Sequence, residues 1–148
     1  MNTRFSVPIL RAVRASAVID ERISGALSAI HGVSLRDLML MLYVKNSHGS
    51  KLSRVELARR LCVSPSTVTR ATNPLEKIGL ISRQSDSRDA RLSYVVLTAA
   101  GAKLLKHAEK TLEHLSIDFL SPNFSEKELT QLTNLLNKLT ADFPGDTP

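Results

Sequence analysis

Several features are scarce in this chain of 148 residues, and each scarcity excludes a class of protein. A single cysteine, Cys62, excludes an internal disulfide framework and a multi-cysteine zinc or iron–sulfur site. With no tryptophan, two tyrosines and four phenylalanines, the chain is too poor in aromatics for a platform that stacks single-stranded bases. No apolar run approaches the ~18 residues of a membrane span, and residues 1–10 lack the apolar stretch of a signal peptide. We therefore expect one cytoplasmic domain without a membrane partner.

The sequence also lacks the residue patterns of enzymes and metal sites. It contains no Ser/His/Asp or Cys/His arrangement and no phosphate-binding glycine loop. Its four histidines are not accompanied by cysteines or carboxylates at metal-ligand spacing. We therefore expect no catalytic activity, no metal and no cofactor.

The formal net charge is +6, and most of the excess lies in the middle of the chain. Residues 51–91 carry nine basic and four acidic residues, whereas residues 92–121 carry three of each. A local basic excess is typical of proteins that bind an anionic partner, with nucleic acid first among them. Charge alone leaves open the alternative of a solvated basic face with no partner.

Apolar spacing and capping residues predict helices on both sides of the basic segment. Apolar residues recur every three or four positions over 6–30. The run 38–44 is apolar all round, so a helix that begins after Ser34 is expected to be central and buried, and 46–50 is expected to be a loop. A long helix is predicted over 98–120. The last helix, which begins after Ser125, carries a narrow apolar seam of Leu129, Leu132, Leu136, Leu139 and Phe143.

Two short helices and a hairpin are predicted between these long helices. Ser53 and Glu56 form a capping box at the start of the first short helix, which ends near Leu61. After a turn at Cys62 and Val63, Ser64 caps a second helix that continues to about Ile78. Two short helices joined by such a turn are a helix-turn-helix. Residues 80–84 and 92–97 then read as two strands around a charged tip, so the segment is a winged helix-turn-helix.

The second short helix has the composition of a helix that reads a major groove. Its first two turns carry short hydroxyl side chains and one arginine, which can bond phosphates or base edges: Ser64, Ser66, Thr67, Thr69 and Arg70. The alternative is that Ser64 and Thr67 only cap the helix, and we expect Ser64 to act mainly as a cap. Pro74 lacks the N–H that would bond to the carbonyl of Arg70, so a kink is expected there.

Residues 53–101 resemble the MarR family (multiple antibiotic resistance regulators). The matching pieces are Glu56-Leu57-Ala58, Ser66-Thr67-Val68-Thr69-Arg70, Leu75-Glu76-Lys77-Ile78-Gly79-Leu80-Ile81, Asp86-Ser87-Arg88-Asp89-Ala90-Arg91 and Val96-Leu97-Thr98-Ala99-Ala100-Gly101. The flanking helices match in number and order. The resemblance implies a homodimer that binds a pseudo-palindromic operator on double-stranded DNA, often as a repressor of neighbouring genes.

The resemblance also implies roles for individual residues. Ser66, Thr67, Thr69 and Arg70 match positions that approach the major groove, and Arg88 matches the arginine at the wing tip that enters the minor groove. Asp86, Asp89 and Arg91 match wing positions whose charge pairs order the hairpin; Arg91 is also kept as a candidate DNA contact. The first and last helices supply the dimer interface in the family, which fits the seam from Leu129 to Phe143.

Two further features have both a functional and a structural interpretation. Met39, Met41 and Tyr43 could line a pocket for a small-molecule effector, because family ligands often bind between the dimer helices and the DNA-binding lobe; ordinary core packing is the alternative. Cys62 could sense oxidants, because Arg59, Arg60 and the next helix N-terminus could lower its thiol pKa; a packed thiol in the turn is the alternative.

The expected fold is mainly α with a small β-wing. A winged helix-turn-helix lobe over 34–98 is joined to a helical dimerisation region formed by residues 1–31 and 99–148, all within one domain. The expected function is a dimeric DNA-binding transcriptional regulator modulated by a small molecule. The alternatives are an architectural dimer without an effector and a winged-helix module for protein contacts.

Overall fold

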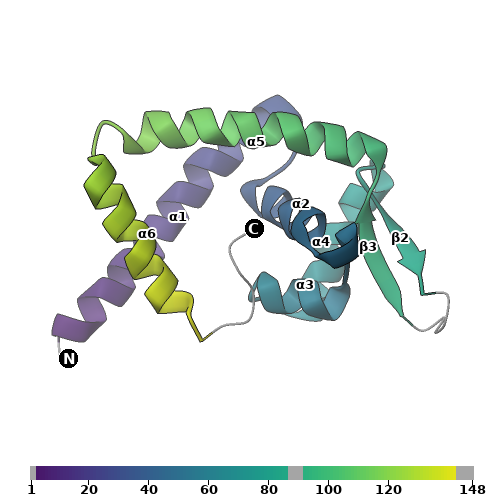
Figure 1. The fold of residues 1–148 in the computed structure, drawn as a ribbon, viewed down its shortest axis with the longest axis horizontal. Coiled ribbons are helices and arrows are strands. Elements are labelled where there is room, and N and C mark those ends of the chain that lie inside the picture. Colours follow the sequence, from purple (N-terminus) through teal and green to yellow (C-terminus); the bar gives the residue numbers. More distant parts are fainter. Residues whose placement is uncertain (1–2, 87–91, 143–148) are drawn as a thin grey trace.

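The computed structural model describes residues 3–86 and 92–142. Within these residues the chain forms six α-helices, one 3-10 turn and three strands (Figure 1). In chain order these are α1 (Thr3–His31), α2 (Leu35–Asn46), η1 (His48–Ser50), β1 (Lys51–Ser53), α3 (Arg54–Arg60), α4 (Pro65–Lys77), β2 (Ile81–Ser85), β3 (Ser93–Leu97), α5 (Ala99–Leu120) and α6 (Glu126–Thr140). The predicted mainly helical fold with a small β-wing is confirmed.

Local capping explains where most of these helices begin. In three of them a serine hydroxyl accepts the N3 backbone N–H while the N3 carboxylate accepts the N-cap N–H: Ser34 with Asp37 in α2, Ser53 with Glu56 in α3, and Ser125 with Glu128 in α6. Glycines with positive φ follow two helix ends, at Gly32 (72°) and Gly79 (76°). The helix α4 continues through Pro74 to Lys77.

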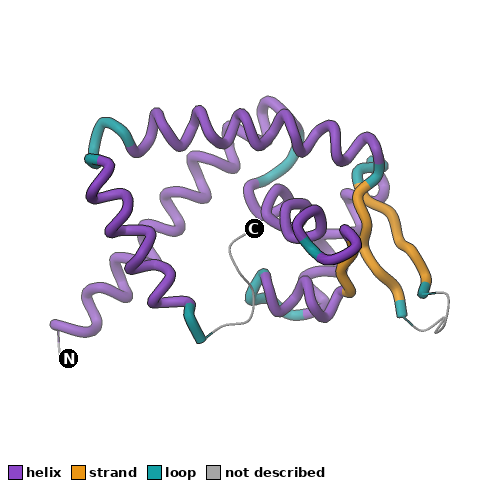
Figure 2. The backbone as a smooth tube through the Cα atoms, in the orientation of Figure 1, coloured by secondary structure: helices purple, strands orange, loops and turns teal. Residues whose placement is uncertain are grey.

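The sheet has one strand that the sequence did not predict. Its order is β1-β3-β2, and both pairs are antiparallel. The predicted hairpin is present, with Ile81 opposite Leu97 and Ser85 opposite Ser93. The additional strand β1, which follows the predicted loop at 46–50, pairs Leu52 with Val95, so the segment just before α3 is tied to the sheet (Figure 2).

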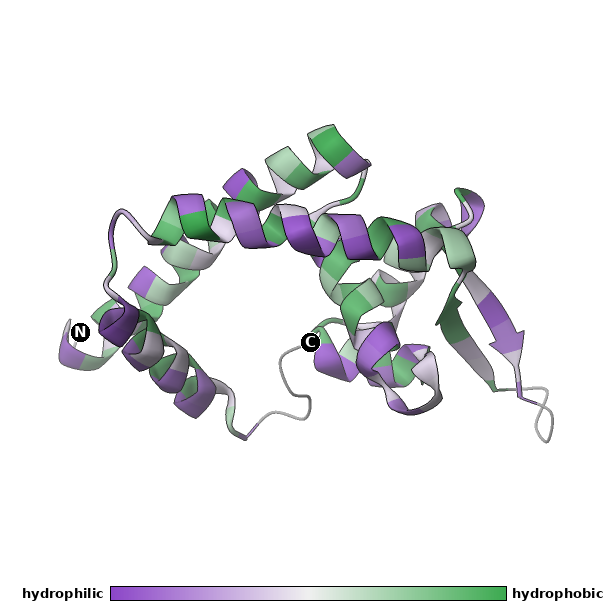
Figure 3. Ribbon diagram, turned by 45° about the horizontal axis from the view of Figure 1, so that its top comes forward, coloured by the Kyte–Doolittle hydropathy of each residue, from purple (hydrophilic) through white to green (hydrophobic). Residues whose placement is uncertain are grey.

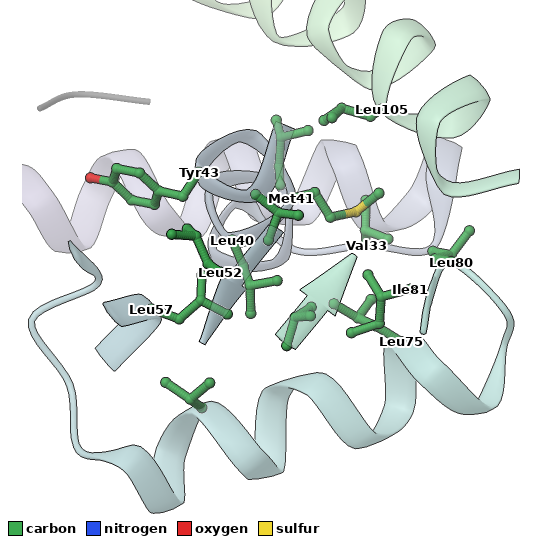
Figure 4. Packing of buried hydrophobic residues seen from close by; sticks show 14 of the residues in the cluster. Val33, Leu40, Met41, Tyr43, Leu52, Leu57, Leu75, Leu80, Ile81 and Leu105 are labelled. Atoms are coloured by element: carbon green, nitrogen blue, oxygen red, sulfur yellow. The ribbon is translucent and has the colours of Figure 1, made fainter. Parts of the chain in front are cut away.

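The hydrophobic core lies in the winged helix-turn-helix lobe around α2. Leu38, Leu40, Met41 and Val44 have no exposed surface, which confirms the prediction that this helix is central. Figure 4 shows side chains from the surrounding elements packed around α2: Leu57 of α3, Leu75 of α4, Leu80 of the turn before β2, Ile81 of β2 and Leu105 of α5. Burial on this scale favours folding by about 25 cal/mol per Å² of apolar surface removed from water.

The helix α5 connects this lobe to an arm made of α6 and the N-terminal half of α1 (Figure 1). Its first half is joined to α2 by an ion pair between Lys45 Nζ and Glu109 Oε1 at 2.6 Å. Its middle is joined to the end of α1 by a hydrogen bond of 2.8 Å between His31 Nε2 and Thr111 Oγ1. These contacts fix the direction in which α5 leaves the lobe.

The arm exposes many apolar side chains, and α6 has no buried residue. Hydrophobic and hydrophilic stretches alternate along α1 and α6 (Figure 3). The exposed apolar side chains, each between 44% and 71% accessible, are Phe5, Val7, Ile9, Leu10, Val13, Leu135, Leu136 and Leu139. No helix in the described part of the chain is by itself long and apolar enough to cross a membrane; α1 and α2 reach that composition only as a pair bent by 78°.

Candidate nucleic-acid interface

The N-terminus of α4 is organised by one serine. The hydroxyl of Ser64 accepts the backbone N–H of Thr67 at 3.2 Å, and Pro65 occupies the first turn. The same Oγ atom lies 2.9 Å from Ser66 Oγ and 2.9 Å from Thr67 Oγ1. Ser64 is therefore a cap, and its hydrogen bonds gather three hydroxyl groups at the exposed end of the helix.

The predicted reading residues share the solvent-facing side of α4. Ser66 and Arg70 are exposed, whereas Thr67 and Thr69 are half-buried. Arg70 Nη2 lies 3.4 Å from Thr67 Oγ1, and Thr69 Oγ1 donates to the carbonyl of Pro65 at 3.1 Å. The opposite side of the helix packs on the core through Val68, Thr72 and Leu75. The structure thus brings the hydroxyl and arginine side chains together on one accessible face.

Two exposed residues continue this face and were missed by the sequence analysis. Asn73 and Lys77 follow Arg70 by three and seven positions, which places all three side chains on one side of a helix. The helical spacing that was used to find apolar faces would have found them. The polar face therefore runs along the whole length of α4.

The base of the wing is held by a small cluster around Tyr94. The backbone N–H of Asp86 donates to the carbonyl of Leu92 at 3.0 Å, next to the last strand pair. Burial, then the negative charge of Asp86 and a hydrogen bond with its carboxylate, raise the pKa of the Tyr94 hydroxyl above its ordinary value of 10.0. The ammonium group of Lys51 lies 4.6 Å from the centroid of the Tyr94 ring. Asp86 is thus placed at the base of the wing, whereas Arg88, Asp89 and Arg91 lie outside the described residues.

Arg83 connects the wing to α4, and the sequence analysis did not single it out. From strand β2 its Nε atom lies 2.9 Å from Glu76 Oε2. Its Nη2 atom donates to Asn73 Oδ1, also at 2.9 Å. One guanidinium group therefore holds two residues of α4, on either side of Pro74.

The predicted effector residues do not share one site. Met41 is fully buried and Tyr43 is 5% exposed, so both belong to the core. Met39 lines a groove of about 770 Å³ between α1, α2 and α6, whose other lining residues include Arg11, Arg36, Leu132 and Leu136. Among the predicted seam residues, Leu129 and Leu132 are half-buried and Leu136 and Leu139 are exposed, whereas Phe143 lies outside the described residues.

Cys62 occupies the turn between α3 and α4 with a φ of 52°. Its thiol is exposed and lies 3.7 Å from the carbonyl oxygen of Arg59. Together with Val55 and Pro65 it lines a shallow depression of about 550 Å³. This exposure shows that the thiol is not fully packed in the turn.

A capped helix with an exposed polar face, preceded by a short helix and followed by a β-hairpin, defines a winged helix-turn-helix protein. Comparison with known proteins agrees. The sequence profile described as the MarR family matches residues 34–93. The transcriptional regulator AdcR of Streptococcus pneumoniae is 31% identical over 106 residues, which cover 70% of each chain. The HTH-type transcriptional repressor Rv2887 of Mycobacterium tuberculosis is 29% identical over 129 residues, covering 87% of this chain and 90% of the relative.

A solved structure has the same fold over the full chain. The MarR family transcriptional regulator Sco3205 of Streptomyces coelicolor, in complex with DNA, superposes with a TM-score of 0.84 at 16% identity, covering 100% of this chain and 94% of that one. The chain belongs to the MarR family of DNA-binding transcriptional regulators. Members of this family regulate transcription and are not enzymes.

Proposed function

We propose that the protein is a homodimeric repressor that binds a pseudo-palindromic operator and is released by a small-molecule effector. The observation that carries the proposal is the capped α4, which presents Ser66 and Arg70 to solvent beside a hairpin, with Thr69 half-buried between them. Residues 34–98 form the DNA-binding lobe, and residues 1–31 and 99–148 form the dimerisation region. Its target is chromosomal DNA, so it works in the cytoplasm.

The position of each side chain on α4 and the wing indicates which part of the DNA it would contact. Arg70 is long, exposed and always charged, which suits guanine or phosphate; Ser66 and Thr69 are short and suit phosphates or base edges. Ser64 caps the helix, with the hydroxyl of Thr67 beside it, and the free N–H groups of this helix end suit a phosphate. In the wing, Arg88 enters the minor groove and Arg91 contacts the backbone, while Asp86 and Asp89 order the hairpin.

Dimerisation through the arm would cover apolar surface that the single chain leaves exposed. Contiguous apolar patches of this kind mark interaction sites in soluble proteins. The seam of Leu129, Leu132, Leu136, Leu139 and Phe143, with the exposed start of α1, is the surface we assign to the partner copy. A two-fold dimer places two recognition helices on half-sites about one helical turn apart.

The effector is proposed to occupy the groove beside Met39 rather than the core around Met41. Its mainly apolar lining, which also contains Arg11, Arg36 and Asp20, suits a small amphipathic ligand. Such a ligand changes DNA affinity only if it binds the free and DNA-bound arrangements with different affinity.

The proposal is tested by binding of the purified protein to its own upstream intergenic DNA and to unrelated DNA across a salt series. We expect tight, specific binding that weakens steeply with salt. Weak, equal binding to all sequences would support the architectural alternative, and no binding even at low salt would support a module for protein contacts.

Substitutions identify which residues read DNA. Arg70→Ala should weaken binding to the operator more than binding to unrelated DNA. An equal loss of affinity for both kinds of DNA would show that Arg70 contacts only phosphate. Arg88→Ala should weaken operator binding while the dimer stays intact; unchanged affinity would remove the wing from the mechanism. Lys103→Ala, which removes an exposed charge from α5, is the matched control and should bind as the unchanged protein does.

The dimer is tested separately by light scattering after size-exclusion chromatography. Leu136→Glu places a charge on the proposed interface and should give a monomer. Val55→Glu changes a residue of similar exposure on α3 and should leave the dimer intact. A monomer in the unchanged protein would refute the dimer directly.

A further inference from the structure

The polar face of α4 contains a side chain whose orientation is fixed by the wing. Asn73 is exposed and lies three residues after Arg70, about 4.5 Å further along the helix axis. It therefore lies next to the residue that we propose to read the operator. The geometry around Asn73 shows which of its groups is turned toward that face.

The partner of Asn73 determines how its amide group is oriented. A guanidinium group only donates hydrogen bonds, so the atom of Asn73 that faces Arg83 Nη2 at 2.9 Å is the amide oxygen. The Nδ2 group, with its two N–H donors, is then directed away from Arg83. Within the described part of the chain this group has no hydrogen-bond partner.

Arg83 is itself held in place. Its Nε atom is paired with the carboxylate of Glu76, one turn beyond Asn73, and both partners are about two-fifths exposed or less (43% and 35%). Two contacts by one planar group restrict its rotation more than a single contact does. Because Arg83 belongs to β2, its position is set by the strand pair with β3, opposite Val95.

The same contacts support α4 at Pro74, where a backbone hydrogen bond of the helix is missing. Pro74 removes the backbone hydrogen bond to the carbonyl of Arg70, which lowers the stiffness of α4. Arg83 holds the residue before Pro74 and a residue after it, and α4 remains a continuous helix from Pro65 to Lys77. The second half of α4 and the wing strand β2 are therefore joined as one unit.

We propose that Asn73 is a further specificity-determining residue for the operator and that Arg83 is the positioning residue that orients it. The inference rests on the proposed reading of DNA by α4. Asparagine pairs with adenine when its oxygen accepts from N6 while its nitrogen donates to N7. Here the oxygen is engaged by Arg83, so Asn73 presents donors. Donors fit guanine, whose major-groove edge carries two acceptors, O6 and N7.

The experiment measures relative affinity for operator variants that carry each of the four bases at every position. The unchanged protein should prefer guanine at one position in each half-site, next to the position that is lost in Arg70→Ala. Asn73→Ala should flatten this preference by about fivefold to tenfold and leave the other positions unchanged.

Arg83→Met separates positioning from stability. Removing the donors frees the amide group of Asn73 to turn over, so the preference at that same position should move from guanine toward adenine. A purely structural role for Arg83 would lower affinity for all variants equally and leave the preference unchanged. Glu76→Gln is the control, because glutamine still accepts from Arg83, and its preference should match that of the unchanged protein.

The outcomes distinguish this inference from the function on which it rests. If the unchanged protein shows no base preference anywhere, the proposed operator reading is wrong and the role of Asn73 is wrong with it. If the unchanged protein is selective and Asn73→Ala retains the full pattern, only the role of Asn73 is overturned. Circular dichroism and light scattering on each variant exclude unfolding and loss of the dimer as causes.

Discussion

Gly101, in the first turn of α5, has no room for a side chain. A Cβ atom built there would lie 1.9 Å from the carbonyl oxygen of Leu80 and 2.8 Å from its carbonyl carbon. That carbonyl cannot turn aside easily, because it accepts hydrogen bonds from the backbone N–H of Thr98 at 3.1 Å and from Thr98 Oγ1 at 3.2 Å. In the variant Gly101→Ala, α5 or Leu80 must therefore move by about 1.5 Å to restore an ordinary contact.

The expected cost follows from two opposing effects. Forcing one methyl group against a fixed backbone typically destabilises a fold by about 1–3 kcal/mol. Alanine gains up to about 1 kcal/mol over glycine in a helix interior, and less in the first turn. We expect the free energy of unfolding to fall, and the midpoint of thermal unfolding to drop by a few degrees and at most about 10 °C for a chain of this length.

Gly25 in α1 provides the matched control, because the same substitution there meets nothing. No atom lies within 4 Å of a Cβ built at Gly25. Gly25→Ala should therefore raise the midpoint through helix propensity alone. Both variants are compared by calorimetry at one protein concentration, because the midpoint of the proposed dimer would depend on concentration. An unchanged or higher midpoint for Gly101→Ala would show that α5 does not approach Leu80 closely.

Three further predictions concern local features of the lobe. Cys62→Gly should raise the free energy of unfolding by about 1 kcal/mol, measured in urea, because the residue has a φ of 52°; a loss would contradict the left-handed backbone. Hydrogen bonds from the side chain and backbone of Ser53 lower the pKa of Glu56 below its ordinary value of 4.5. The stability that the Glu56 carboxylate contributes is therefore complete above pH 4.5 and is lost as the pH falls through the folded pKa. In Glu56→Gln the free energy of unfolding should fall less steeply in acid, and an equal dependence on pH would refute this. Lys45→Met should cost at most about 1 kcal/mol, because the ion pair with Glu109 is largely exposed, and 1 M salt should reduce the difference.

The elements that sequence analysis predicted correctly are those that local chemistry determines. The capping boxes at Ser34, Ser53 and Ser125 each combine a hydroxyl with a carboxylate three residues later, and the three helices begin after these serines as predicted. The cap at Ser64 followed by Pro65 placed the start of α4 in the same way. Since the polar face of α4 begins at this cap, its first two turns could also be located from the sequence.

The features that were missed depend on contacts between distant residues. Strand β1 has three residues, too few for an alternating pattern, and forms because Leu52 pairs with Val95, which lies far along the chain. The contacts of Arg83 with Asn73 and Glu76 require the chain to turn back after Gly79. In contrast, the separation of Met39 from Met41 could have been predicted, because residues two apart on a helix lie about 200° apart.

The contacts of Leu80 also show how a change in the arm would reach α4, the helix that we propose reads DNA. Leu80 lies three residues after Lys77, where α4 ends, and Thr98, which caps α5, donates to the carbonyls of both Gly79 and Leu80. The peptide groups of Gly79 and Leu80 thus connect the end of α4 to the start of α5, which leads to the arm. Gly101 packs directly against the carbonyl of Leu80. A ligand or partner that tilts α5 must either break these hydrogen bonds or move the end of α4. Since both the backbone N–H and the hydroxyl of Thr98 donate to these carbonyls, breaking the connection costs two donors their partners, and α4 is expected to follow α5. In Gly101→Ala the added methyl group pushes α5 and Leu80 apart. This variant should therefore lose operator affinity at a temperature where it is still folded, whereas Gly25→Ala should keep its affinity.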